Sequence, residues 1–222
     1  MNKQKYIITL VLFFSFFKGF AQDVEYPFAS DILKFKSIDS LNPPPQNAIL
    51  FLGSSSFTMW NDVQHYFPGF TIVNRGFGGS SFTDLIRYAD YIVFPYHPKQ
   101  VVIYCGENDF ASSDSISPTI VNGRFVQLFS LIRTKMPDVK ITFVSIKPSP
   151  SRWQLKDKFI SSNHFIRKFL KSQPNTSFVN VWHKMLGRNK QPLKGIFLAD
   201  QLHMNSTGYK IWENAITPHL IK

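Results

Sequence analysis

A run of small polar residues after a strongly apolar segment is the first place where this chain could do chemistry. Residues 48–52 are continuously apolar, and Gly53, Ser54, Ser55 and Ser56 follow them directly. A buried strand that delivers a hydroxyl to a pocket has this form, although most serines after a strand only cap the next helix. Ser55 is therefore a candidate nucleophile that needs partners elsewhere in the chain.

Asp200 and His203 could be those partners. A serine nucleophile needs an imidazole within hydrogen-bond reach and a carboxylate that fixes the tautomer of that imidazole. The two residues stand three positions apart, so one turn of chain can bring them together. We predict that His203 is the general base for Ser55 and that Asp200 orients it. The alternative is that His203 is a helix-capping or surface histidine.

The tetrahedral intermediate of acyl transfer also needs hydrogen-bond donors for its negatively charged oxygen. Residues 74–79 read NRGFGG, and three glycines in four positions are typical of a tight turn with exposed backbone N–H groups. Asn108, within the sequence GEND, offers a side-chain amide. We predict an oxyanion hole made by the backbone N–H groups of Ser55 and Gly79 and the amide of Asn108. A plain turn and an Asx turn are the alternatives.

These stretches follow the predicted strands of a single parallel sheet. Nearly continuous apolarity indicates strands that are buried on both faces, at residues 48–52, 71–74, 100–105, 140–146 and 177–181. Helical spacing of apolar residues fills the gaps, and the first helix follows the capping signal Ser81-x-x-Asp84. Further helices are predicted around residues 125–132 and 155–169 and from near Asn205. The alternation predicts a three-layer α/β/α sandwich that binds ligands beyond the carboxyl ends of its strands.

Together the stretches resemble the SGNH, or GDSL-type, esterases and lipases. The resemblance rests on four blocks in order, FLGSSSFTMW, NRGFGGS, GEND and DQLHMN, and it covers Ala48 to the C-terminus. It implies the same nucleophile, base, orienting acid and oxyanion donors as above. It also implies a flavodoxin-like SGNH hydrolase fold with strand order 2-1-3-4-5.

One position departs from the family pattern. The first block of the family often reads Gly-Asp-Ser, whereas Ser54 stands here in place of the acid. Asp84 and Asp109 are candidates to take over any supporting role of that acid. There is no Gly-x-Ser-x-Gly elbow, which argues against the α/β-hydrolase fold. The remaining histidines lack ligand spacing, so we expect neither a metal nor a cofactor.

A polar stretch after the fourth predicted strand lies at the same edge of the sheet as Ser55. It reads KPSPSRW, at residues 147–153, and is either a wall of the substrate cleft or merely a stiff loop. Arg75, in the second block, is a further candidate. The predicted substrate rim consists of Arg75, Lys147, Ser149, Arg152 and Trp153.

The N-terminal segment predicts export. Lys3 and Lys5 precede an apolar run at residues 6–17, and Gly19 and Ala21 provide small residues for cleavage. The run is shorter than the roughly 20 residues that span a bilayer, so we expect no stable membrane insertion after cleavage of residues 1–22. An uncleaved anchor is the alternative. Residues 23–45 are predicted to be an irregular lead-in, and residues 46–222 the hydrolase domain, in the periplasm or secreted.

Composition indicates one globular domain with a basic surface. The chain has 222 residues, 44% of them hydrophobic, and a formal net charge of +11. Its basic residues are spread along helical stretches without a motif for base stacking, so we expect no nucleic-acid partner. The single cysteine, Cys105, excludes an internal disulfide and belongs to a buried strand.

The leading functional hypothesis is an exported serine esterase that removes small acyl groups, acetyl above all, from a small molecule or a glycan. The sequence has no long apolar lid segment, which favours a polar, accessible substrate; the acetyl-glycan part rests on the resemblance. A lipolytic acylhydrolase or lysophospholipase is an alternative suggested by the basic charge and the 23 phenylalanines. A non-catalytic glycan-binding relative is another, suggested by Ser54.

Overall fold

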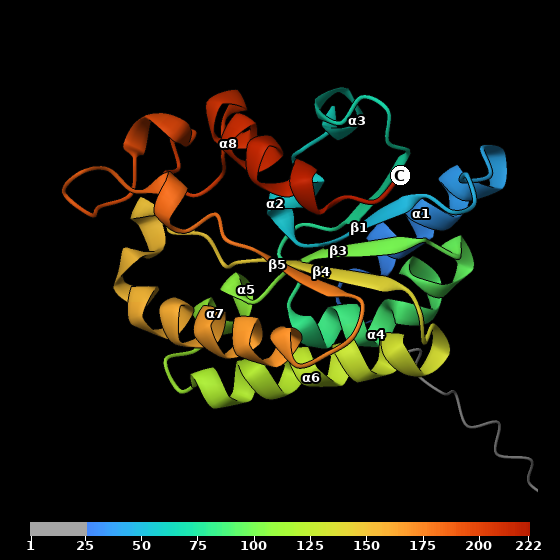
Figure 1. The fold of residues 1–222 in the computed structure, drawn as a ribbon, viewed down its shortest axis with the longest axis horizontal. Helices are drawn as coiled ribbons and strands as arrows, with labels where there is room; N and C mark the ends of the chain where they lie inside the picture. The colour runs from blue at the N-terminus through green and yellow to red at the C-terminus, as the bar shows by residue number, and fades with distance from the viewer. Residues whose placement is uncertain (1–25) are drawn as a thin grey trace, which may run out of the picture.

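The computed structural model describes residues 26–222, which form a three-layer α/β/α sandwich (Figure 1). Its sheet has five parallel strands in the order β2-β1-β3-β4-β5, so the predicted fold class and strand order are confirmed. In the central pairing, Leu50 lies opposite Val73 on one side and Val101 on the other. The strands are β1 (Ile49–Gly53), β2 (Ile72–Gly76), β3 (Gln100–Tyr104), β4 (Lys140–Val144) and β5 (Thr176–Val179).

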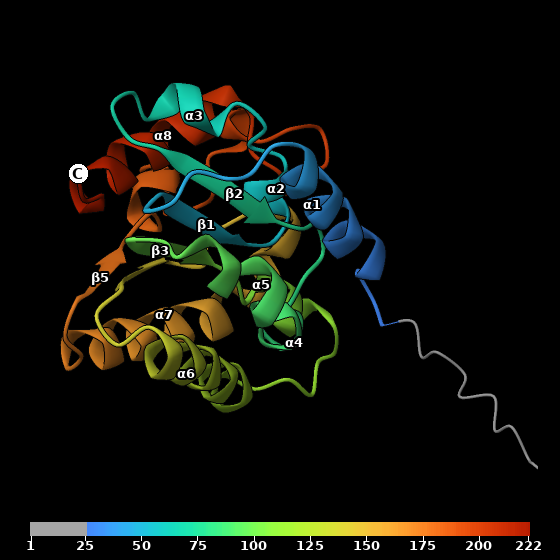
Figure 2. The ribbon, with the colours of Figure 1, turned by 90° about the vertical axis from the view of Figure 1, so that its right-hand side faces the viewer.

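Helices cover both faces of the sheet, as the views in Figures 1 and 2 show. One face carries α4 (Phe82–Ile92), α6 (Pro118–Lys135) and α7 (Lys156–Lys171), and α1 (Ala29–Leu41) packs against α4. The other face carries α2 (Ser55–Thr58), α3 (Val63–Tyr66) and α8 (Ser206–Ile216). The short helix α5 (Glu107–Ala111) follows β3 at its carboxyl end.

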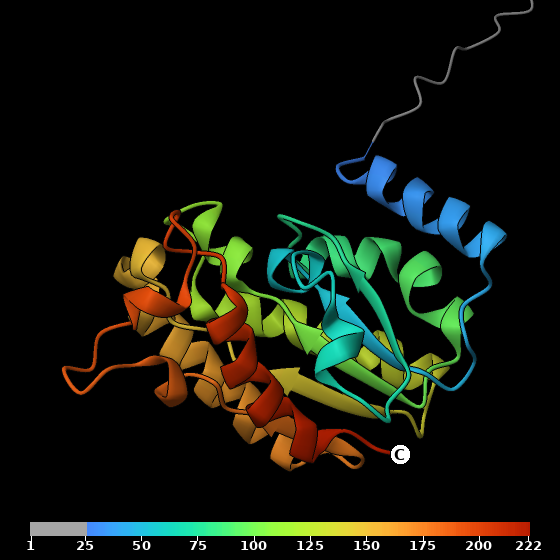
Figure 3. The same ribbon diagram turned by 90° about the horizontal axis from the view of Figure 1, so that it is seen from above.

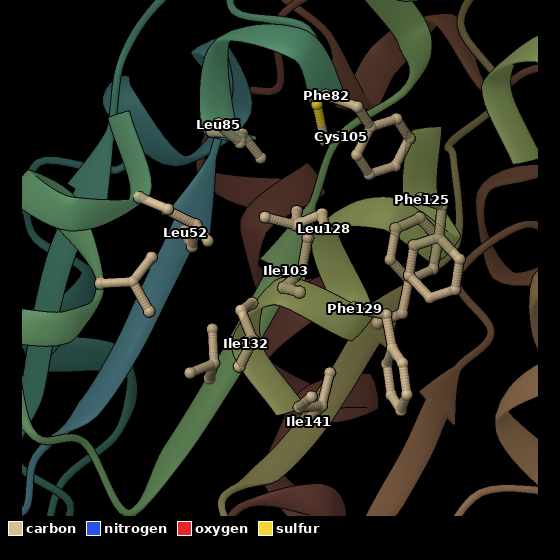
Figure 4. Close-up of a cluster of buried hydrophobic side chains, with 14 of the residues drawn as sticks. Leu52, Phe82, Leu85, Ile103, Cys105, Phe125, Leu128, Phe129, Ile132 and Ile141 are labelled. Atoms are coloured by element: carbon tan, nitrogen blue, oxygen red, sulfur yellow. The ribbon is translucent and has the colours of Figure 1, made fainter. Parts of the chain in front are cut away.

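Two apolar cores explain why the strand sequences are continuously apolar. Leu50 and Leu52 of β1 pack into the core beneath α4 and α6, part of which Figure 4 shows. Ile49 and Phe51 of the same strand pack into the core beneath α8. Each such side chain stabilises the fold by about 1.5–3 kcal/mol when fully buried. Successive residues of a central strand therefore all need to be apolar.

The predicted helix starts are realised by hydrogen bonds. The backbone N–H of Ser81 donates to the Asp84 carboxylate at 2.9 Å, which completes the capping box of α4. At the start of α8, the side chain of Asn205 accepts hydrogen bonds from the backbone N–H groups of Thr207 and Gly208. These caps satisfy N–H groups that have no partner within the helix.

The lead-in at residues 23–45 was predicted to be irregular, and this prediction is wrong because residues 29–41 form α1. Its apolar residues are spread around the helix instead of forming one face, and only Ile32 of the helix is buried. Tertiary contacts hold it instead: the Tyr96 hydroxyl donates to Asp39 at 2.5 Å, and Arg75 forms an ion pair with the same carboxylate. Figure 3 shows α1 at the edge of the domain.

The predicted signal peptide, residues 1–22, lies outside the described residues. Within residues 26–222, no helix combines the length and the apolarity that a membrane crossing requires.

Candidate active site

Ser55 stands where β1 ends and α2 begins. The last residue of β1 is Gly53, and the neighbouring strand β3 passes very close to it. A Cβ atom at Gly53 would lie 2.0 Å from the backbone oxygen of Tyr104, so no other residue fits without moving β3. Strand β1 therefore ends so that Ser55 lies at the carboxyl edge of the sheet.

The structure brings Ser55, His203 and Asp200 into one hydrogen-bonded chain. His203 Nε2 lies 3.0 Å from Ser55 Oγ, and His203 Nδ1 lies 2.6 Å from Asp200 Oδ2. The other carboxylate oxygen of Asp200 accepts the backbone N–H groups of Leu202 and His203, at 2.9 and 3.0 Å. Asp200 thus holds both the imidazole ring and the turn that carries it.

The environment keeps Asp200 ionised. Burial raises the pKa of its carboxyl, but hydrogen bonds from the Leu202 backbone and from the His203 side chain and backbone outweigh burial and lower that pKa to about 2. An ionised carboxylate favours the imidazole tautomer with its proton on Nδ1. Nε2 is then an acceptor for the Ser55 proton, as a general base must be.

Ser54 contacts two of the three predicted oxyanion donors. Its Oγ accepts the backbone N–H of Ser55 at 2.6 Å and the Asn108 side-chain amide at 3.0 Å. The same amide nitrogen also donates to the Ser80 carbonyl at 3.0 Å. Ser54 and the Ser80 carbonyl thus hold the Asn108 amide beside the nucleophile candidate Ser55.

Asp84 and Asp109 do not provide the support expected of them. Asp109 accepts the Phe82 backbone N–H at 3.0 Å and pairs with Arg124 at 2.8 Å. Asp84 caps α4 and pairs with Arg87. None of the hydrogen bonds of these two carboxylates, within residues 26–222, reaches Ser54. Asp109 instead ties the start of α4 to α5.

An open cleft at the carboxyl edge of the sheet is lined by Ser55 and His203 and by the other two residues of the predicted oxyanion hole, Gly79 and Asn108. Gly79 adopts a positive φ of 85°, a conformation that glycine accepts without strain. Asp200 stands behind His203. The cleft is lined by Ser55, Thr58, Met59, Gly78, Gly79, Asn108, Arg152, Leu202 and His203.

Of the five predicted rim residues, Arg152 lines this cleft and the other four lie elsewhere. Lys147 and Ser149 are buried and contact the Glu107 carboxylate. Arg75 is paired with Asp39. The ring of Trp153 stacks on that of Trp182, with 6.0 Å between centroids. Lys147, Ser149 and Trp153 thus stabilise the loop that carries them. Arg75 instead holds α1.

A buried polar cluster around Glu107 was missed by sequence reasoning. The Glu107 carboxylate accepts hydrogen bonds from Lys147 Nζ at 2.6 Å and from the Tyr104 hydroxyl at 2.7 Å. Burial raises the pKa of Glu107, but the positive charges of Lys147 and Arg152 and the hydrogen bonds from Lys147 and Tyr104 together outweigh burial and lower this pKa. The available signal was that Glu107 and Lys147 are charged residues directly after apolar strand sequences. Glu107 adjoins Asn108, so the cluster fixes the start of α5, which carries this donor.

Cys105 is a buried free cysteine. Burial raises the pKa of the Cys105 thiol well above its usual range, which disfavours the reactive thiolate. Across residues 26–222, the structure has no group of three or more His, Cys, Asp or Glu side chains placed to bind a metal ion.

Comparisons with known proteins identify a family and a set of similar folds. The model of the GDSL-like lipase/acylhydrolase family matches residues 52–211. A search of curated proteins found no match. Among solved structures, a GDSL-like lipase from Bacteroides thetaiotaomicron is 23% identical with a TM-score of 0.72, over 85% of this chain and 96% of that one.

Two other solved structures share the fold. A protein from Streptococcus pneumonia, provisionally described as a platelet activating factor, is 20% identical with a TM-score of 0.75, over 86% of this chain and 92% of its own. A catalytic mutant of an acetylxylan esterase from Geobacillus stearothermophilus is 14% identical with a TM-score of 0.62, over 79% and 94%. These likenesses show the shared fold.

Proposed function

Because the chain belongs to the GDSL-like lipase/acylhydrolase family, we propose that it is an exported serine esterase that hydrolyses small acyl esters, acetyl above all, of a small molecule or a glycan. One observation carries this proposal. The hydrogen-bonded chain Ser55–His203–Asp200 opens on a cleft that also contains Gly79 and Asn108. Nucleophile, base and oxyanion donors thus share one surface that water and substrate can reach.

In the proposed mechanism, Ser55 Oγ attacks the ester carbonyl carbon while His203 Nε2 accepts the Ser55 hydroxyl proton. The ionised Asp200 stabilises the resulting imidazolium. The tetrahedral intermediate collapses when the bond to the alcohol oxygen breaks and His203 returns the proton to that oxygen. Water, activated by the same histidine, then attacks the acyl-enzyme, which releases the carboxylic acid and restores Ser55.

The negative oxygen of the intermediate is stabilised by Ser55 N–H, Gly79 N–H and the Asn108 amide. In the resting structure, Ser54 Oγ accepts from Ser55 and Asn108. A charged oxygen is a stronger acceptor than a neutral hydroxyl, so the intermediate competes well for both donors. Removing one such donor raises the barrier by about 3 kcal/mol in comparable sites.

Three features support a small acyl group on a polar substrate. The cleft is open, so a bulky polar substrate can approach Ser55. The predicted export would place the enzyme near extracellular glycans. The acetylxylan esterase among the similar folds supports the acetyl assignment by analogy.

A p-nitrophenyl ester series from acetate to octanoate tests the proposal on the chain without residues 1–22. We expect kcat/KM to fall with acyl length, and Ser55→Ala to lower kcat by about 10⁴-fold or more. The matched control is Ser115→Ala, an exposed serine remote from the cleft, which should leave activity unchanged.

Two results would contradict the proposal. Undiminished hydrolysis by the Ser55→Ala variant would rule out Ser55 as nucleophile. A preference for octanoate would indicate lipolysis instead of deacetylation. A fluorophosphonate probe that labels Ser55 would separate both enzymes from a non-catalytic glycan-binding protein.

A further inference from the structure

Arg152 is the one permanently charged residue among those that line the cleft. Among the described residues, no aspartate, glutamate or lysine lines the cleft. An arginine guanidinium stays protonated throughout the usual pH range. The surface that faces the substrate is therefore positive at a single, defined place.

The Glu107 carboxylate interacts electrostatically with Arg152 but forms its ion pair with another residue. Arg152 Nη1 donates to the backbone carbonyl of Glu107 at 3.0 Å, and the Glu107 carboxylate is instead paired with Lys147 at 2.6 Å. No ion pair to Arg152 occurs within the described residues 26–222. Because only one of its five N–H groups is used in this way, the guanidinium keeps donors for a ligand.

The backbone beside Arg152 is fixed relative to the nucleophile's base. The Ser151 backbone N–H donates to the Gln201 carbonyl at 3.1 Å, which joins this turn to the one that carries Asp200 and His203. Trp153, on the other side, stacks on Trp182. These contacts fix the backbone on both sides of Arg152, which lines the cleft, and a binding residue needs such support.

We propose that Arg152 is an anion subsite and that the favoured substrates are acetyl esters of acidic molecules, with a carboxylate next to the esterified hydroxyl. This inference rests on the proposed function and adds the substrate class. The acetyl group has no acid, so the carboxylate belongs to the alcohol part, as in an acetylated uronic acid. The planar guanidinium fork matches a carboxylate with two parallel hydrogen bonds.

The test compares a mono-O-acetyl methyl glucuronoside with the matching mono-O-acetyl methyl glucoside, which lacks the carboxylate. We expect the wild-type kcat/KM to be about tenfold higher for the acidic ester at low salt, the size of one charge-assisted hydrogen bond. Raising the salt concentration should reduce this ratio because the site is open to solvent. In Arg152→Gln the ratio should fall to about one, and Arg152→Lys should retain part of it.

The matched control is Arg167→Gln, which removes an equal charge from the exposed face of α7 and should leave the ratio unchanged. A wild-type ratio near one, or an equal loss on both esters in Arg152→Gln, would overturn the anion subsite while the esterase assignment stands. If Arg152→Gln does not fold, the wild-type ratio and its salt dependence still decide. If the wild type hydrolyses neither ester and Ser55 resists the fluorophosphonate probe, the proposed function fails, and this inference with it.

Discussion

Two side-chain pairs in this region have the same separation of 2.6 Å between nitrogen and carboxylate oxygen but opposite surroundings. His203 and Asp200 have side chains that are 21% and 47% exposed. Lys147 and Glu107 have side chains that are only 1% and 7% exposed. The first pair is exposed to water, so a substrate can reach it for proton exchange. The second pair is buried next to the start of α5, which carries Asn108.

The comparison teaches that exposure, and not distance, separates a reacting pair from a positioning one. An exposed pair contributes little to stability because water and salt screen it. An intact buried pair adds little net stability because the cost of burying its charges offsets their attraction, but loss of one partner leaves an uncompensated charge in the interior. We therefore expect changes in the first pair to affect catalysis and changes in the second to affect folding.

The largest effect is expected from His203→Ala. It removes the proposed base, so kcat should fall by about 10⁴-fold or more while the melting temperature stays close to that of the wild type. Steady-state kinetics and thermal denaturation measure the two quantities. His164→Ala, on the exposed face of α7, is the control and should change neither. A large fall in melting temperature for His203→Ala would break the comparison.

The next largest effect is expected from Lys147→Met, which leaves the Glu107 carboxylate buried without a counter-charge. It should lower the free energy of unfolding by about 3–5 kcal/mol, measured by urea denaturation. Adding Glu107→Gln should recover part of this loss, since an amide oxygen still accepts the Tyr104 hydroxyl. Lys135→Met is the control: its pair with Asp90 is exposed, so its cost should stay below about 1 kcal/mol.

A smaller effect is expected from Ser54→Ala, which connects the two regions. Without the hydroxyl, Asn108 retains only its hydrogen bond to the Ser80 carbonyl. One neutral hydrogen bond contributes about 0.5–1.5 kcal/mol, so kcat should fall by up to about tenfold with KM little changed. Kinetics with p-nitrophenyl acetate measure this, and an unchanged kcat would show that Ser54 does not position the donor.

The smallest effect concerns stability at low pH. The folded-state pKa of Asp200 is about 2, below its ordinary value of 3.8, so ionised Asp200 stabilises the fold above about pH 4. This contribution is lost as the pH falls through about 2. Asp200→Asn should therefore show a shallower fall in unfolding free energy between about pH 4 and pH 2 than the wild type. Urea denaturation at several pH values measures it, and parallel curves would contradict the assignment.

The sandwich and the central site could be predicted from the sequence because each signal was local. Continuous apolar runs marked the strands, and Ser55, Gly79 and Asn108 each follow a strand, so the topology brings them to one edge. Helix α1 was not predicted because polar contacts with Arg75 and Tyr96 hold it in place. Such contacts leave no single apolar face in the helix sequence.

The Glu107–Lys147 pair could not be predicted for a different reason. Its members are 40 positions apart and meet because β3 and β4 are neighbours in the sheet. Position after a strand placed Lys147 and Ser149 at the correct edge but not on the correct side of the loop. Whether a side chain faces the cleft or the interior depends on the backbone path of the loop, which residue types do not specify.

Phe28, at the start of α1, has a practical consequence for the limits of the domain. Its ring packs edge-on against Phe77 at 5.3 Å, and a Cβ atom on Gly79 would lie 3.6 Å from it. The family match begins only at residue 52. A shortened chain cloned from Gln46 would lose this wall of the glycine turn and the partner of Arg75. A shortened chain that keeps both contacts must therefore start upstream of Phe28.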